Sequence, residues 1–252
     1  ERVGSHGKIL QVLIACICPT APSDLRTVSL AILCRVSHVM FLRIKPGERL
    51  VPSVVKLLDR SKKFEAESVK MCLELIRRLA EQPHHRSALQ AACKDVTRHL
   101  MSLTWAYAFA PDFRTLCLDA LMRFTIAIPS AFQQGSKREG LCITFLILVL
   151  KDLKKDEQGD RLRAAHILLK IAEGPGGIAK LQQYESDLVE VLACVDGQAA
   201  GGNQQAMDLS VQLGSILHAL IPTEAPYRRA LDNYQMTHVA GAVAASIVYE
   251  ES

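Results

Sequence analysis

DLRTVSLAILCRV at residues 24–36 and DFRTLCLDALMRF at residues 112–124 are near copies of one another, and they decide the fold class of this chain. Six of the thirteen positions are identical, and most of the others exchange one apolar residue for another. The copies begin 88 residues apart, which is two periods of about 44 residues. Periods of this length are typical of repeated pairs or triplets of helices. The two copies therefore predict an array of helical repeats.

The composition favours helices over strands. Hydrophobic residues make up 49% of the 252 residues, but aromatic residues make up only 5%. A core of Leu, Ile, Val and Ala suits packed helices, whereas strands favour β-branched and aromatic residues. The formal net charge of +4 is too small to indicate a nucleic-acid-binding protein by itself, because such proteins carry a clustered basic face.

Proline and glycine divide the chain into about eleven helical segments. The predicted helices cover about 8–18, 23–42, 48–59, 64–81, 84–107, 112–128, 137–154, 158–173, 177–195, 203–221 and 226–249. Ser23 and Asp24 stand where the N-cap of the helix at 23–42 is expected, and Asp112 stands where that of the helix at 112–128 is expected. When the segments are grouped in pairs, first helices and second helices both recur at intervals of roughly 40 to 50 residues.

Apolar residues follow helical spacing within the two copies. Val28, Leu30 and Leu33 share one face of the first copy, and Leu116, Leu118 and Leu121 share that face in the second. One pair of helices cannot cover such a face by itself, so neighbouring pairs must stack on it.

With its repeated Asp-x-Arg-Thr helix and this spacing, the chain resembles the armadillo/HEAT superfamily of α-solenoids. The resemblance implies an all-α superhelical stack of about five helix pairs plus a terminal helix, forming a single domain over residues 1–252. Residues 84–107 and 129–136 depart from a two-helix unit, and a three-helix armadillo-like repeat is the alternative there. Because the chain opens with Glu1, we expect it to be part of a longer protein.

The cysteines predict buried thiols in a reducing compartment, and therefore an intracellular protein of the cytoplasm or nucleus. Cys16 and Cys18 could suggest a metal site together with Cys34, but residues two apart on a helix point in different directions. The longest apolar run, residues 141–150, is about half of what a helix needs to cross a bilayer. We therefore expect neither a metal nor a membrane segment.

Motifs of catalysis are missing from the sequence. His84 and His85 are adjacent and diverge on a helix, and no His-Glu-x-x-His, Gly-x-Ser-x-Gly or P-loop pattern occurs. The glycine-rich residues 174–177 lack the Lys-Ser/Thr of a phosphate-binding loop and are typical of a helix end. We therefore expect no catalytic residue, no cofactor and no enzymatic activity.

Basic residues recur on the second helices, which in the solenoids that the chain resembles line the concave, ligand-binding surface. The candidate partner-binding residues are Arg26, Arg35, Arg77, Arg114, Arg123 and Arg161. They predict a non-catalytic scaffold that binds a protein partner, either an acidic extended peptide or a helix. The alternative is a scaffold that contacts nucleic-acid phosphates through the same side chains. Acidic residues are interleaved with the basic ones, and this mixture favours the protein partner.

Overall fold

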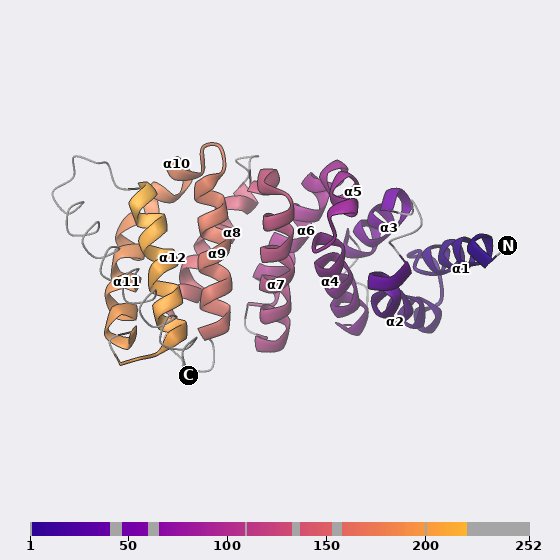
Figure 1. The fold of residues 1–252 in the computed structure, drawn as a ribbon, viewed down its shortest axis with the longest axis horizontal. Coiled ribbons are helices and arrows are strands. Elements are labelled where there is room, and N and C mark those ends of the chain that lie inside the picture. Colours follow the sequence, from indigo (N-terminus) through magenta and orange to yellow (C-terminus); the bar gives the residue numbers. More distant parts are fainter. Residues whose placement is uncertain are drawn as a thin grey trace, which may run out of the picture. The chain divides into compact units, whose positions relative to one another are not determined.

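The computed structural model of the chain describes residues 2–40, 47–59, 66–108, 110–132, 137–152, 158–199 and 201–220. These residues form α-helices joined by short turns, and no strand occurs among them (Figure 1). The helices are α1 (Arg2–Cys16), α2 (Ser23–Met40), α3 (Gly47–Asp59), α4 (Ala66–Ala80), α5 (Arg86–Ala91), α6 (Cys93–Ala106), α7 (Pro111–Ala127), α8 (Lys137–Lys151), α9 (Gln158–Glu173), α10 (Gly177–Leu181), α11 (Glu185–Ala199) and α12 (Gln204–Leu220). The predicted all-α class is thus confirmed.

Two predicted helices are each divided in the structure. The segment predicted at 84–107 forms a 3-10 turn at Pro83–His85, then α5 and α6, with Ala92 between the two helices. The segment predicted at 177–195 forms α10, a 3-10 turn at Gln182–Tyr184 and α11. Neither break is marked by proline or glycine, so no turn signal was present to predict it. The helix predicted at 226–249 lies outside the described residues.

Helix α7 starts earlier than predicted, so its N-cap is not the predicted residue. The N-cap is Ala110, Pro111 occupies the first turn, and no side chain bonds to the free backbone N–H groups. Asp112 therefore lies inside the first turn, and its prediction as the cap is wrong. Its negative charge still favours the helix start, because the N-terminal end of a helix carries partial positive charge.

The chain divides into two compact units, Glu1–Gln134 and Gly135–Ser252. In the first unit α4 packs between α2 and α7, while α3 packs against both α1 and α6 (Figure 1). In the second unit α12 packs against α9, and α11 packs against α8. Each unit therefore contains one layer of first helices (α1, α3 and α6, or α8 and α11) and one layer of second helices (α2, α4 and α7, or α9 and α12), joined in pairs.

Leucine side chains fill the space between the two layers. Leu30 and Leu33 of α2 are fully buried, as are Leu118 and Leu121 of α7, which confirms the predicted apolar face at these positions. Val28 does not belong to that face, because its side chain is largely exposed. Leu116, its counterpart in α7, is only partly buried. The spacing of apolar residues thus located the core but wrongly placed these two residues in it.

Side-chain polar contacts between neighbouring helix pairs span a nearly constant number of residues. They join residues 36 to 42 positions apart, in the pairs Thr27–Ser68, Cys34–Met71, Arg77–Asp119, Gln90–Ser130, Thr144–Tyr184, Lys151–Asp187 and Glu139–Lys180. The residue numbers rise together along α2 and α4, and again along α4 and α7. Successive second helices of the first unit therefore run parallel.

Gly177 is the glycine at which the backbone of a neighbouring segment approaches most closely, among the glycines that the structure describes. It follows Gly176, whose φ of 69° lies in the left-handed region, and a Cβ atom at Gly177 would overlap the backbone carbonyl group of Ile171. We expect Gly177→Ala to lower the free energy of unfolding by at least about 2 kcal/mol, because the backbone must shift to remove the overlap. The measurement is urea-induced unfolding followed by circular dichroism.

Gly140 provides the matched control for this substitution. It lies in α8, and no heavy atom lies within 4 Å of a Cβ atom placed there. Gly140→Ala should therefore stabilise the protein by about 0.5–1 kcal/mol through its helix propensity. Equal stability of Gly177→Ala and the wild type would contradict the close approach of the backbone at Gly177.

Candidate interaction surface

Three of the six candidate arginines are buried in the structure. Arg26, Arg114 and Arg161 are 6%, 8% and 1% exposed, respectively. Arg26 and Arg114 occupy the same position of the two sequence copies, so this recurring arginine belongs to the interior. The structure therefore does not place these three guanidinium groups on a common outer surface.

Arg26 is held by the turn that precedes its helix. Its Nη1 atom donates to the carbonyl oxygens of Pro19 and Ala21, at 3.4 and 3.3 Å. A guanidinium group has five N–H donors in a rigid fork, so it can satisfy carbonyl groups that a turn leaves without helical partners. This role accounts for the burial of Arg26.

Arg161 of α9 is the most deeply buried of the six. Its Nε atom donates to the carbonyl oxygen of Leu150 in α8, at 2.9 Å. Burial is the main cause that lowers the pKa of the guanidinium group, and the electrostatic influence of Cys194 and Asp152 opposes that shift. Arg161 thus joins α9 to the last turn of α8.

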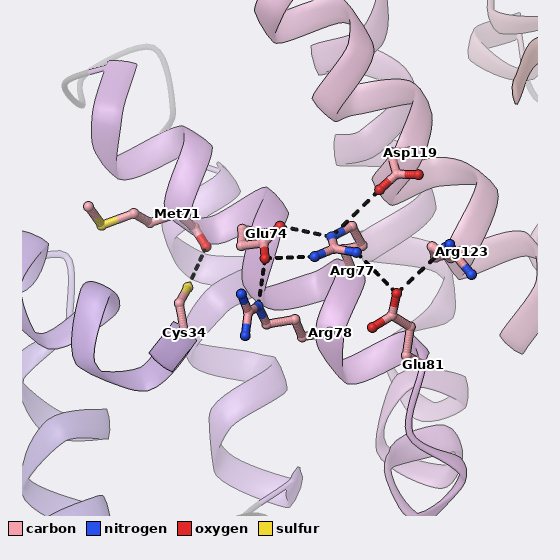
Figure 2. Close-up of polar contacts among 8 residues, drawn as sticks. All are labelled: Cys34, Met71, Glu74, Arg77, Arg78, Glu81, Asp119 and Arg123. Atoms are coloured by element: carbon pink, nitrogen blue, oxygen red, sulfur yellow. Dashed lines mark hydrogen bonds and ion pairs between the residues drawn. The ribbon is translucent and has the colours of Figure 1, made fainter. Parts of the chain in front are cut away.

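The other three candidates remain accessible. Arg35 on α2 and Arg123 on α7 are exposed, and Arg77 on α4 is about one-quarter exposed. Arg77 and Arg123 belong to one cluster of ionic side chains, which we call the charged row (Figure 2). Its members are Glu74, Arg77, Arg78 and Glu81 from α4 and its end, and Asp119 and Arg123 from α7.

Glu74 anchors the charged row. Both of its carboxylate oxygens accept hydrogen bonds from Arg77, each at 2.8 Å, and Arg78 donates to the Oε1 atom at 2.6 Å. Two parallel N–H···O bonds of this kind fix the planes of both groups. The hydrogen bond from Arg77 is the main cause that lowers the pKa of Glu74, and the same pairing raises the pKa of Arg77.

Arg77 connects the part of the charged row on α4 with the part on α7. Besides Glu74 it meets Glu81 at 3.1 Å and Asp119 at 3.6 Å, and Glu81 in turn lies 3.6 Å from Arg123 (Figure 2). Arginine and carboxylate groups thus alternate across the two parallel helices. The row presents cations at both of its ends, Arg78 on one side and Arg123 on the other.

The two sides of α4 contact its neighbours differently. Toward α2, the Cys34 thiol donates to the carbonyl oxygen of Met71 at 3.3 Å, and burial raises the pKa of that thiol to about 11. Toward α7, the Lys70 ammonium group lies 5.0 Å from the centre of the Phe113 ring, which stacks on Tyr107. Close contacts on both sides hold α4 firmly.

The cysteines are thiols rather than disulfides, and all eight lie in described residues. Cys34, Cys72, Cys93, Cys117 and Cys142 are buried, whereas Cys18 and Cys194 are exposed. Burial raises the pKa of the Cys117 and Cys142 thiols to about 12. Within the described ranges no group of three or more His, Cys, Asp or Glu side chains is arranged to hold a metal ion.

Sequence reasoning found Arg77 and Arg123 but missed the row that joins them. Glu74, Arg78, Glu81 and Asp119 were not among the predicted partner-binding residues. The spacing of Glu74 and Arg77, three residues apart on one helix, was the signal that could have indicated their pairing. The contact of Arg77 with Asp119 depends on the packing of α4 against α7 and has no signal in the local sequence.

Comparisons with known proteins concern the fold. No family model matches the chain, and no curated protein matches it. A crystal structure of an engineered protein, a Northeast Structural Genomics Consortium target, is similar, with a TM-score of 0.59, 14% sequence identity, and coverage of 92% of this chain and 96% of that chain. At this identity the likeness shows the fold alone. In the described part of the chain, no helix has the length and apolar character required to cross a membrane.

The charged row predicts a pH-dependent contribution to stability. Because the folded-state pKa of Glu74 is lowered, its ionised form stabilises the fold above the unfolded-state pKa of about 4.3, and this stabilisation is lost as the pH falls through the folded-state value. Glu74→Gln should lower the free energy of unfolding at pH 7 by about 1 kcal/mol. The difference between this variant and the wild type should become smaller below about pH 5. The measurement is urea unfolding at pH 7, 5 and 3.

Asp95→Asn provides the control, because the Asp95–Arg98 pair is exposed and joins residues three apart on α6. This control should change stability by less than about 0.5 kcal/mol at any pH. If Glu74→Gln and the wild type lost the same stability between pH 5 and 3, the role assigned to Glu74 would be wrong.

Proposed function

We propose that this chain is a non-catalytic protein-interaction scaffold of the armadillo/HEAT α-solenoid type. In this proposal the second helices form the binding surface, and the partner is an acidic segment in extended conformation. The observation that carries the proposal is the charged row, which offers partly exposed arginines from two parallel neighbouring helices.

The solenoid part of the proposal is supported by the packing inside each unit. First helices lie beside first helices and second helices beside second helices. The contacts between neighbouring pairs join residues 36 to 42 positions apart, which is a repeat length in the range of such arrays. Parallel second helices give a surface on which equivalent positions recur at regular distances.

The acidic partner is supported by the geometry of Arg78 and Arg123. They lie at the two ends of the row, on α4 and α7, and each retains part of its surface for solvent. Packed helices are about 8–10 Å apart, and an extended polyproline II chain advances about 3.1 Å per residue. A peptide that crosses the two helices would therefore meet one arginine about every third residue.

The acidic members of the row hold these arginines in position before a partner arrives. Side chains that are already ordered lose less conformational entropy on binding. Arg77, bound by three carboxylates, fixes the spacing of Arg78 and Arg123 through Glu74 and Glu81. These carboxylates repel any anion, but a phosphate backbone carries a charge at every nucleotide, whereas the proposed peptide needs one carboxylate only at about every third residue, so the row disfavours nucleic acid more strongly than the peptide.

The cysteines support an intracellular location within the proposal. Thiols, several of them buried, are what a protein folded in a reducing compartment retains. The cytoplasm and the nucleus both provide such conditions.

The test uses a fluorescein-labelled peptide of five Glu-Ala-Pro repeats, which places a carboxylate at every third residue of an extended chain. Fluorescence anisotropy with the full 252-residue chain should show saturable binding of this peptide. Binding should weaken at least about tenfold in the double variant Arg78→Glu/Arg123→Glu, since each reversal replaces an attraction by a repulsion. A peptide of Gln-Ala-Pro repeats should bind more weakly by a similar factor.

Arg98→Glu serves as the matched control, because Arg98 is an exposed arginine of a first helix, α6. It should leave the affinity unchanged. Equal binding of the Glu and Gln peptides, or wild-type affinity in the double variant, would contradict the proposal. Tighter binding of a single-stranded oligonucleotide, with steep loss of affinity as salt rises, would favour the nucleic-acid alternative.

A further inference from the structure

An apolar stripe lies exposed on α2, apart from the charged row. Leu25, Val28 and Ile32 are 46%, 56% and 38% exposed. Their spacing of three and four residues places them on one face of the helix. The face that packs against α4 is a different one, because Thr27 and Cys34 make those contacts. We call Leu25, Val28, Ile32 and the nearby Arg35 the α2 edge.

In α7, the second sequence copy, the equivalent face is covered by a neighbouring helix. Residues 112–124 match 24–36 position by position, so Phe113, Leu116 and Ala120 are the counterparts of Leu25, Val28 and Ile32. In α7 this face meets α4. Lys70 of α4 lies over the Phe113 ring, and Ala120 is fully buried.

Arg35 extends the correspondence to the charged end of the stripe. Its counterpart in α7 is Arg123, which lies 3.6 Å from Glu81 at the end of α4. Arg35 is exposed and forms no ion pair with any described residue. A helix packed on the α2 edge with a carboxylate in the position of Glu81 could therefore form an ion pair with Arg35.

The differences between the two copies indicate which side chains a helix would need in order to cover the α2 edge. Asp119, which meets Arg77 of α4, is replaced by Ala31 in α2. Phe113, which lies under Lys70, is replaced by Leu25. A helix that fits α2 thus needs apolar side chains where α4 carries Lys70 and Arg77, and an acidic one where the chain carries Glu81.

We propose that the α2 edge binds an amphipathic α-helix of a partner protein, parallel to α2 and in the manner in which α4 packs against α7. The stripe of the partner helix would contact Leu25, Val28 and Ile32, and a carboxylate near its C-terminal end would pair with Arg35. This surface is separate from the charged row, and the inference does not depend on the proposed binding of an acidic extended peptide.

The probe is a peptide that copies residues 66–82 with the changes Lys70→Leu and Arg77→Leu, held helical by a hydrocarbon staple on its outer face. Fluorescence anisotropy with the full chain should show saturable binding, and a scrambled stapled peptide should not bind. Leu25→Glu/Ile32→Glu should weaken binding at least about tenfold, because two carboxylates would be placed against apolar side chains. Circular dichroism checks that each variant remains folded.

Charge reversal tests the register. Arg35→Glu should weaken binding of the probe about three- to tenfold, as expected for one partly exposed ion pair. A second probe that also carries Glu81→Arg should bind the Arg35→Glu variant with restored affinity. It should bind the wild type more weakly than the first probe does. Recovery of this kind requires the two side chains to meet, so a general loss of structure cannot produce it.

Leu148→Glu is the matched control, because Leu148 is an exposed leucine on α8 of the second unit. It should leave binding unchanged, and so should Arg78→Glu/Arg123→Glu. Absence of binding beyond that of the scrambled peptide, or wild-type affinity in Leu25→Glu/Ile32→Glu, would overturn the proposal. Concentration-dependent dimerisation that this variant abolishes and the probe does not inhibit would assign the edge to a second copy instead, and would also overturn it.

Discussion

Packing of each second helix against the next one along the chain is the constraint on which the rest of the first unit depends. A single helix pair leaves one apolar face open, so Leu30 and Leu33 of α2 and Leu118 and Leu121 of α7 become fully buried only because neighbours stack on them. The charged row is a consequence of this packing. Arg77 meets Asp119 because α4 and α7 are held side by side and parallel.

The two copies of the Asp-x-Arg-Thr helix show how one repeated sequence serves different ends. Of the identical residues, Leu30, Leu33 and Arg26 are buried, and so are their counterparts in α7, whereas the shared residues Arg35 and Arg123 are exposed. Their differing residues determine the neighbour. Asp119 in place of Ala31 gives α7 an ionic contact with α4, whereas α2 presents an apolar edge at the equivalent face. The two helices thus share the leucines of the core and differ in the residues that contact the neighbouring helix.

The all-α class and the approximate position of most helices could be predicted because proline, glycine and apolar spacing act locally. The break at Ala92 could not, since no residue there disfavours a helix and only tertiary packing divides α5 from α6. The candidate site was predicted in part. Arg123 was found on the surface, but a long guanidinium group can also reach inward to backbone carbonyls, as Arg26 does, and composition does not distinguish the two. Val28 was assigned to the core because periodicity marks an apolar stripe without saying which helix covers it.

The nearly constant separation of 36 to 42 residues between contacting side chains also bears on how the chain folds. Contacts of this kind are local compared with a length of 252 residues, and folding is fast when few distant segments must meet. In the proposed solenoid each helix pair needs only its immediate neighbours to become stable, so folding could begin at any well-packed pair and spread to the adjoining ones. By the same reasoning, loss of one pair weakens the adjoining pairs first, and the described helices come apart as a series of neighbouring groups.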